Sequence, residues 1–218
     1  MLAILDLILP PACAACGSAG ALLCSACLRR ARPASDAACR FVAPDPAFAI
    51  GQELSLAVAG FAFEGPIRRA LARLKYDGAS RLADPLANAA APALKRLVEV
   101  TGAAPLIPVP VHRNRLRERG YNQAELIARA LGSRVGLPVL DRLERVRPTS
   151  KQHRLDRAAR LANLRAAFSV RSASASMPAT VIVVDDIGTT MATLEACASV
   201  LRAAGARDVY GFAVAREI

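Results

Sequence analysis

The segment spanning residues 179–194, ATVIVVDDIGTTMATL, constrains the fold of this chain more than any other. Its apolar run at 181–184 is followed by two adjacent carboxylates, Asp185 and Asp186, and then by a short loop of small and hydroxyl residues. An alanine-rich helical pattern comes next. This order predicts a buried strand that ends at the carboxylates, a polar turn and a helix N-terminus. In open α/β sheets that arrangement forms an anion site at the carboxyl end of the strand.

Apolar, β-branched segments alternate with amphipathic helical patterns along most of the chain. Pro108 and Pro110 indicate a strand that runs quickly into a loop. The alternation predicts an α/β domain with a parallel sheet and helices on both faces. Strands are expected at 56–63, 106–111, 143–146, 168–170, 181–184 and 208–215, helices at 67–75, 81–100, 121–135 and 190–204, and a basic loop with a helix at 150–165.

Two Cys-x-x-Cys pairs lie near the N-terminus, Cys13 with Cys16 and Cys24 with Cys27. Each such turn points two sulfurs at one centre, and two turns complete a tetrahedral zinc site. The alternative, four unrelated buried cysteines, does not explain two matched pairs. A ligand set made only of thiolates predicts one structural zinc ion. A proline-rich stretch follows, so we expect a small four-cysteine zinc module at 1–45 and an α/β domain at 46–218.

The 218-residue chain is strongly basic, with 29 Lys and Arg against 18 Asp and Glu and a net charge of +11. This surplus predicts anionic partners such as phosphorylated small molecules or nucleic acid. The alternative is an arginine-rich composition with no such role. A secretion signal is not expected, because the apolar segment 1–10 lacks a basic n-region and a small-residue cleavage site. A transmembrane segment is not expected either, because no charge-free apolar run reaches about 18 residues. The expected location is the cytoplasm, where thiols stay reduced and clustered cysteines bind metal.

Five blocks of the sequence resemble the ComF family, in the order that the family has them. They are LPPACAACGSAGALLCSAC at 9–27, KYDG at 75–78, IPVPVHRNRLRERGYNQAELIARAL at 107–131, RPTSKQHRLDRAARLANLRAAFSV at 147–170 and VIVVDDIGTTMAT at 181–193. The last block also resembles the phosphoribosyl-pyrophosphate (PRPP) motif of type I phosphoribosyltransferases. The resemblance implies a zinc module followed by a type I phosphoribosyltransferase-like parallel sheet with flanking helices.

The resemblance also implies which residues bind ligand, with Mg²⁺ accompanying PRPP. The basic stretch 147–165 matches a mobile loop that covers the site, and its alternative is a solvated basic face. No residue stands out as a catalytic base. The implied ligand-binding residues are Asp185 and Asp186 for the ribose hydroxyls, Thr189, Thr190, Ala192 and Thr193 for the 5′-phosphate, and Val111, His112 and Arg113 for the pyrophosphate.

The sequence departs from the family pattern in two places. Met191 stands where the phosphate loop usually has glycine, which permits positive φ and close backbone approach. Methionine there predicts a strained backbone and less space beside the phosphate. Cys39 follows the first four cysteines, but Val42 occupies the position of its partner, so one zinc ion is expected rather than two.

Two functions fit these observations. The first is binding of PRPP or another phosphorylated small molecule together with a role in DNA uptake during natural transformation, with single-stranded DNA and the uptake machinery as partners. The alternative is an active phosphoribosyltransferase of nucleotide metabolism whose acceptor is unknown, and the two can coexist. Because the chain is 4% aromatic and lacks tryptophan, DNA contact is expected mainly through phosphates.

Overall fold

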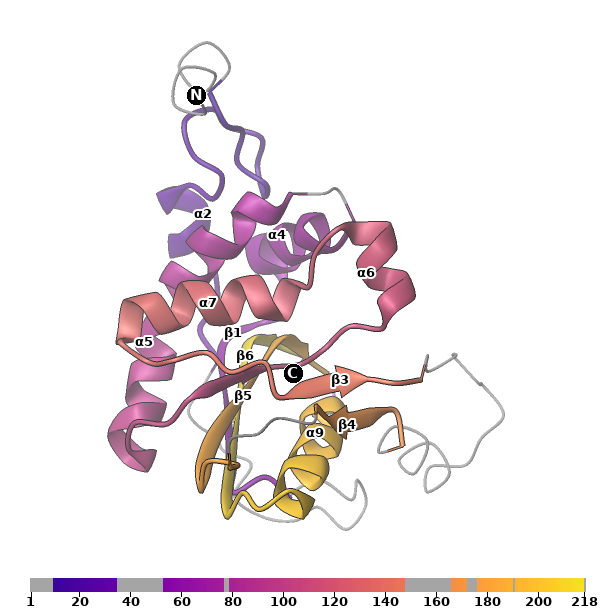
Figure 1. Cartoon of the computed structure of the whole chain (residues 1–218). Coiled ribbons are helices and arrows are strands. Elements are labelled where there is room, and N and C mark those ends of the chain that lie inside the picture. The colour runs from indigo at the N-terminus through magenta and orange to yellow at the C-terminus, as the bar shows by residue number, and fades with distance from the viewer. Residues whose placement is uncertain are drawn as a thin grey trace.

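The computed structural model describes residues 10–34, 53–76, 79–147, 166–171, 176–189 and 191–217. Within these residues a four-stranded parallel sheet forms the centre of the molecule, with strand order β1-β6-β5-β2 (Figure 1). A separate antiparallel pair, β3-β4, lies beside it. The α/β prediction is therefore confirmed. The strands are β1 (Leu56–Ala62), β2 (Leu106–Pro108), β3 (Leu143–Arg145), β4 (Phe168–Val170), β5 (Thr180–Gly188) and β6 (Asp208–Arg216).

Helices cover both faces of the sheet, and strand β5 shows why. Ile182 and Val184 are fully buried in a cluster with α4, α5 and α7, whereas Val181 and Val183 are buried in a second cluster with α9. A strand covered on both faces is apolar throughout, which explains the continuous hydrophobic run in the sequence. The helices are α2 (Ser25–Arg29), α4 (Gly65–Tyr76), α5 (Ala83–Thr101) preceded by a 3-10 turn η1 (Ser80–Leu82), α6 (Arg113–Arg119), α7 (Gln123–Val135) and α9 (Ala192–Ala203).

The structure differs from the sequence-based predictions most clearly at β5, α9 and α6. Strand β5 does not end at the carboxylates, because its ladder with β6 continues as far as Gly188. Helix α9 begins at Ala192 rather than at residue 190, since Met191 has a positive φ of 55°. Helix α6 was not predicted, because none of its residues is buried and it therefore has no apolar repeat.

The cysteine-rich segment packs directly on the α/β domain. Cys13 and Cys27 belong to the same hydrophobic cluster as Leu71 of α4. Residue 33 forms an antiparallel bridge with Phe61, and backbone hydrogen bonds on either side extend the sheet edge at β1. Figure 1 shows this segment, in indigo, above α4. The predicted domain boundary at 45–46 lies outside the described residues.

Several residues of the sequence analysis also fall outside the described residues: Cys39, Val42, Thr190 and the part of the basic stretch at 148–165. Among the helices that the structure describes, none combines the length and the apolar character needed to cross a membrane.

Candidate functional site

The four predicted zinc ligands meet at one point. The Sγ atoms of Cys13, Cys16, Cys24 and Cys27 all lie within 4.8 Å of one another. Zinc–sulfur bonds of ~2.3 Å in a tetrahedron place the sulfurs about 3.8 Å apart, and Cys16 Sγ lies 3.8 Å from Cys24 Sγ. Gly17, with φ +80°, closes the first knuckle turn. The donor set and its spacing fit a structural zinc ion.

The protein environment shifts the pKa values of Cys13 and Cys27 in opposite directions. Burial raises the pKa of Cys13, but N–H donors from Cys24, Ala15 and Cys16 outweigh this effect and lower it to about 6. Burial raises the pKa of Cys27 to about 12. A bound Zn²⁺ ion would hold all four sulfurs as thiolates, which compensates for the burial of Cys27.

The two adjacent carboxylates lie on opposite faces of β5, near its carboxyl end. Asp186 follows Ile182 and Val184 in the strand alternation and faces α4, whereas Asp185 faces α9. Asp186 is 5% exposed, and its Oδ2 lies 2.9 Å from Lys75 Nζ. This oxygen accepts no hydrogen bond of good geometry from the described residues, so the ion pair is its observed polar contact. Asp185 Oδ1 accepts a 2.8 Å hydrogen bond from Asp186 N.

The pKa of Asp185 is raised well above the ordinary range of an aspartate. Burial is the largest cause, the negative charge of Asp186 adds to it, and the ammonium of Lys75 opposes both. Two carboxylates this close, one ion-paired and one with a raised pKa, form an arrangement that is typical of ligand-binding and catalytic sites.

The loop after β5 leads into the uncapped N-terminus of α9. Thr189 is exposed, and Ala192 and Thr193 are half-buried in the first turn. Among the described residues, no side chain caps this helix, so its first amides are available to an anion. Met191 is the only non-glycine residue with positive φ among the described residues, which confirms the predicted strain. Its side chain is 2% exposed and packs in the α9 cluster and over Gly188.

The loop after β2 ends at the same edge of the sheet. Pro108 pairs in parallel with Val184, and Val109 N donates to Val184 O at 2.8 Å. His112 Nδ1 accepts from Asn114 N at 3.3 Å and caps α6, whose first residue, Arg113, is exposed. We call this end of the sheet, where β5 and β2 finish, the carboxyl edge. The predicted ribose residues Asp185 and Asp186 lie near the end of β5, and the loops that carry the predicted phosphate and pyrophosphate residues follow β5 and β2 at this edge.

Local sequence patterns assign no role to Lys75 or to the residues that hold the end of its helix. Tyr121 Oη donates to Leu74 O at 2.8 Å, and Gln123 Nε2 reaches the same carbonyl at 3.5 Å. Arg119 donates to Gln123 Oε1 at 3.1 Å and lies 5.4 Å from the Tyr76 ring centroid. Lys75 and Tyr76 lie in the block KYDG, and residues 119–123 lie in RERGYNQ. No local spacing in the sequence links residues 74–76 with 119–123.

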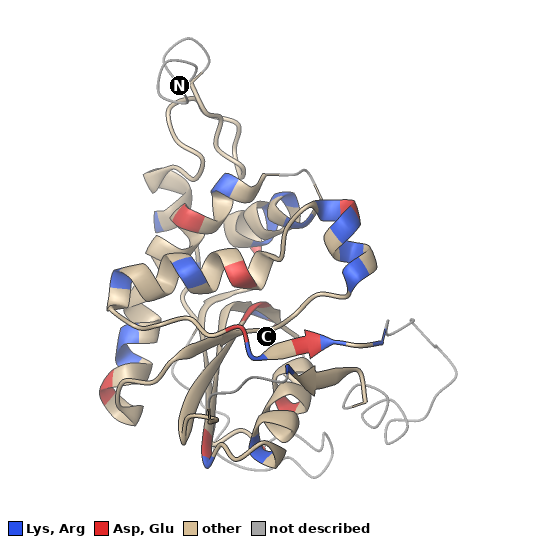
Figure 2. Cartoon of the chain, viewed as in Figure 1, with Lys and Arg blue, Asp and Glu red and all other residues tan. Residues whose placement is uncertain are grey.

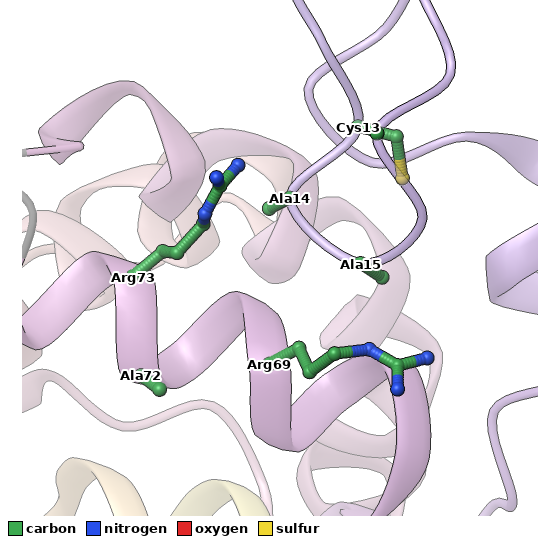
Figure 3. Close-up of a pocket in the computed structure, with 7 residues that line it drawn as sticks. Cys13, Ala14, Ala15, Arg69, Ala72 and Arg73 are labelled. Atoms are coloured by element: carbon green, nitrogen blue, oxygen red, sulfur yellow. The ribbon is translucent and has the colours of Figure 1, made fainter.

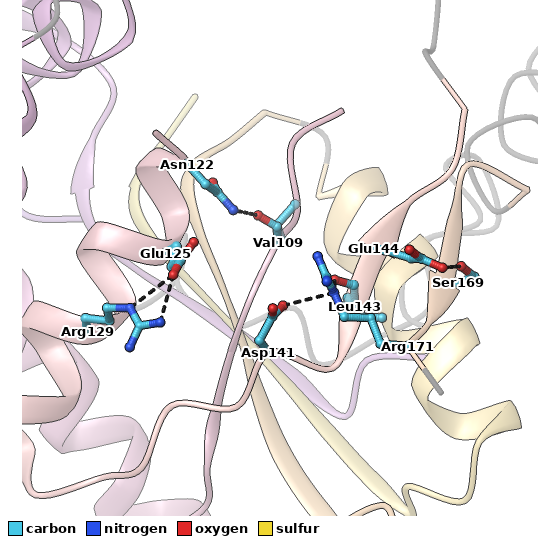
Figure 4. Close-up of polar contacts among 9 residues, drawn as sticks. All are labelled: Val109, Asn122, Glu125, Arg129, Asp141, Leu143, Glu144, Ser169 and Arg171. Carbon is cyan, nitrogen blue, oxygen red and sulfur yellow. Dashed lines mark hydrogen bonds and ion pairs between the residues drawn. The ribbon is translucent and has the colours of Figure 1, made fainter. Parts of the chain in front are cut away.

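Asn122 joins the same block to the carboxyl edge. Its Nδ2 donates to Val109 O at 3.0 Å, as Figure 4 shows, and its Oδ1 caps α7 by accepting from Ala124 N at 3.1 Å. The sequence RERGYNQ therefore connects three elements at this edge: the end of α4, the loop after β2 and the start of α7.

The β3-β4 pair adds a cation near Asp185. Arg145 of β3 lies over the ring of Phe168, 5.3 Å from its centroid. Burial and the charge of Arg115 lower the pKa of Arg145, while the charge of Asp185 opposes this shift. Arg115 and Asp185 therefore both lie within electrostatic range of the Arg145 guanidinium. The strand pair is held by an Arg171–Asp141 ion pair of 3.3 Å and a Ser169–Glu144 hydrogen bond of 3.0 Å (Figure 4).

A cavity of about 350 Å³ lies away from the carboxylates, between the first zinc knuckle and α4. Arg69 and Arg73, one helical turn apart, flank the knuckle loop at Ala14 and Ala15 (Figure 3). Basic residues are also concentrated on α6 (Figure 2). The exposed arginines of these two helices are Arg68, Arg69 and Arg73 of α4 and Arg113, Arg115 and Arg117 of α6.

The fold and the sites define a class of protein: an α/β domain with a parallel sheet, carrying an N-terminal zinc ribbon. Residues 4–53 match the double zinc ribbon domain family. The chain is 32% identical over 169 residues to Competence protein F of Haemophilus influenzae, covering 76% of this chain and 69% of that protein. It is 29% identical over 158 residues to Competence protein ComFC of Streptococcus pneumoniae, covering 72% and 66%. The chain belongs to the ComF family.

Proposed function

We propose that this protein binds PRPP with Mg²⁺ at the carboxyl edge and assists DNA uptake in natural transformation. The observation that carries the first part is the pair formed by Asp185 and Asp186 beside the uncapped N-terminus of α9. The second part is supported by the names of two relatives, both competence proteins.

The chemistry of the carboxyl edge suits a sugar that carries phosphates at both ends. Carboxylates accept hydrogen bonds from vicinal hydroxyls, and free amides at a helix N-terminus bind a phosphate. Arg145 supplies positive charge near Asp185, and Arg113 begins α6 after the loop that follows β2. Guanidinium groups bind phosphate oxygens in pairs. An acidic pair flanked by cations therefore matches the ribose and the diphosphate of PRPP.

The DNA contact belongs to a different surface. Arg69 and Arg73 border the cavity beside the zinc knuckle, and a net charge of +11 favours a polyanion. With few aromatic side chains, binding rests on phosphates and is independent of base sequence. The proposed location is the cytoplasm, where the four thiols stay reduced for zinc.

One observation favours phosphoribosyl transfer as a second candidate. The pKa of Asp185 is raised by burial and by the charge of Asp186, so this carboxyl group holds a proton more readily than an ordinary aspartate and is a candidate general acid or base. In that case an acceptor would form a bond to C1 of the ribose, the bond from C1 to pyrophosphate would break, and pyrophosphate would be released. Assay of pyrophosphate release across candidate acceptors separates this activity from binding alone.

Thermal unfolding with and without PRPP and Mg²⁺ tests the ligand proposal. A ligand at ~100 times its dissociation constant stabilises a folded protein by about 2.7 kcal/mol, so the Tm of the wild type rises. The variant Asp185→Asn/Asp186→Asn should show no such rise, while keeping its own cooperative transition. A wild-type Tm that does not respond to PRPP contradicts the proposal.

A further inference from the structure

We infer that Lys75 is a further ligand-binding residue of the carboxyl edge, where its ammonium joins the Asp186 carboxylate to the diphosphate of the bound sugar. This inference rests on the proposed PRPP binding and assigns one more contact to it. The residues Arg119, Tyr121 and Gln123 act on Lys75 as positioning residues.

The ion pair between Lys75 and Asp186 is largely buried. The side chain of Lys75 is 24% exposed and that of Asp186 is 8% exposed, with 2.9 Å between Nζ and Oδ2. Removing two charges from water has a large desolvation cost that their attraction often fails to recover. A lysine at the end of a surface helix would otherwise keep its ammonium in water. Its burial against Asp186 is therefore better explained by a role in the site than by stability.

The ammonium of Lys75 has more hydrogen-bond donors than Asp186 uses. An ammonium group carries three N–H donors and no acceptor, and the carboxylate of Asp186 uses one direction. The remaining donors suit oxygens of an anion at the same edge. When Asp186 accepts from a ribose hydroxyl, Lys75 lies beside the sugar, where the diphosphate at C1 needs counter-charge. A compact point charge of this kind is a common phosphate ligand.

Side chains from the start of α7 and the residues before it hold the end of α4 in place. The carbonyl of Leu74 lies in the last turn of α4, where helix carbonyls lack an intrahelical partner. Tyr121 and Gln123 both donate to it, and Gln123 is 2% exposed and held in turn by Arg119. These bonds fix the backbone next to Lys75, so the side chain starts from a defined position one residue away.

The test compares two ligands, PRPP with Mg²⁺ and ribose 5-phosphate, by titration calorimetry on the full-length protein. Ribose 5-phosphate has the sugar hydroxyls and the 5′-phosphate but lacks the diphosphate. We expect Lys75→Met to lower the affinity for PRPP about 10-fold or more, because hydrogen bonds to charged groups contribute ~1.5–3 kcal/mol. The affinity of this variant for ribose 5-phosphate should fall less than about 3-fold, because the contacts of that ligand do not include the ammonium.

Three further variants control this comparison. Lys75→Arg keeps the charge and should restore PRPP binding to within about 5-fold of the wild type. Lys95→Met removes an exposed lysine from α5 and should change the affinity for neither ligand. Tyr121→Phe removes only the hydroxyl that donates to Leu74. It should lower the affinity for PRPP by about 2- to 10-fold and leave the affinity for ribose 5-phosphate unchanged.

Each outcome has one interpretation. Equal loss of both ligands in Lys75→Met would show that Lys75 only supports Asp186, which overturns the inference and leaves the proposed function intact. Unchanged PRPP binding in that variant has the same consequence. If ribose 5-phosphate is too weak to titrate, recovery in Lys75→Arg supports the inference and no recovery overturns it. A wild type that binds no PRPP overturns the inference and the proposed function together.

Discussion

The ammonium of Lys75 lies 2.9 Å from the carboxylate of Asp186, across the gap between helix α4 and strand β5. This ion pair gives two adjacent aspartates different electrostatic roles. Asp186 has a cation beside it, whereas Asp185 carries a raised pKa because of burial and the negative charge of Asp186. The two carboxylates should therefore respond in opposite ways to neutralisation.

We predict that Asp185→Asn stabilises the protein at neutral pH and that Asp186→Asn destabilises it, each on the order of 1 kcal/mol. The first change removes a disfavoured charge and keeps an oxygen that can accept from residue 186. The second leaves the Lys75 ammonium without its partner. Urea unfolding of both variants measures the effect, with Glu99→Gln on the exposed face of α5 as a control. Shifts of the same sign would contradict this account.

The stabilisation by Asp185→Asn should depend on pH. A carboxyl group with a raised pKa in the folded state holds its proton there after the unfolded chain has released it. The wild type therefore loses stability as pH rises from about 4 towards the raised value. The difference between Asp185→Asn and the wild type should disappear near pH 4 and be largest above the folded-state pKa.

Met191 and Gly188 should behave as a coupled pair. Met191 has positive φ, which costs ~1 kcal/mol or more, but it buries a side chain whose loss costs about 2–5 kcal/mol. Met191→Gly should therefore be less stable than the wild type and about 1 kcal/mol more stable than Met191→Ala. A Cβ at Gly188 would collide with Sδ and Cε of Met191. Gly188→Ala should thus cost much less in the Met191→Ala background, and additive effects in denaturant unfolding would show that the contact is unimportant.

How far the sequence predicts this molecule depends on the range of each interaction. The parallel sheet and the four-cysteine cluster follow from local patterns, namely a continuous apolar run and two short cysteine spacings. The extension of β5 to Gly188 depends on its pairing with β6, and the arginine-rich helix α6 has no apolar stripe to reveal it. Lys75 reaches Asp186 across more than one hundred residues of sequence, so only the folded chain reveals that contact.

We expect about one zinc ion per chain, bound by the cluster of Cys13, Cys16, Cys24 and Cys27. Cys16→Ser should lose the metal and lower the Tm, because the knuckles share a hydrophobic cluster with α4. Cys39→Ser should keep it. Metal analysis of the purified proteins gives the stoichiometry, and two zinc ions in the wild type would mean that residues beyond these four complete a second site.

Binding of single-stranded DNA should weaken steeply as salt is raised. Each phosphate contact contributes about −0.7 to the slope of log affinity against log salt. Arg69→Gln and Arg73→Gln should each reduce that slope by about one contact and weaken all sequences alike. Arg96→Gln, exposed on α5, is the matched control. Fluorescence anisotropy with labelled oligonucleotides measures the slope, and an affinity that stays constant over a several-fold change in salt rules out phosphate-based binding.

The dissociation constant of PRPP with Mg²⁺, measured by isothermal titration calorimetry, tests the assignment of the carboxyl edge most directly. The measurement compares the wild type with Asp185→Asn/Asp186→Asn. We predict saturable binding to the wild type and at least a ~100-fold weaker affinity in the variant, since two charge-assisted hydrogen bonds are lost. No heat with the wild type, or equal affinity in the two proteins, would contradict the assignment.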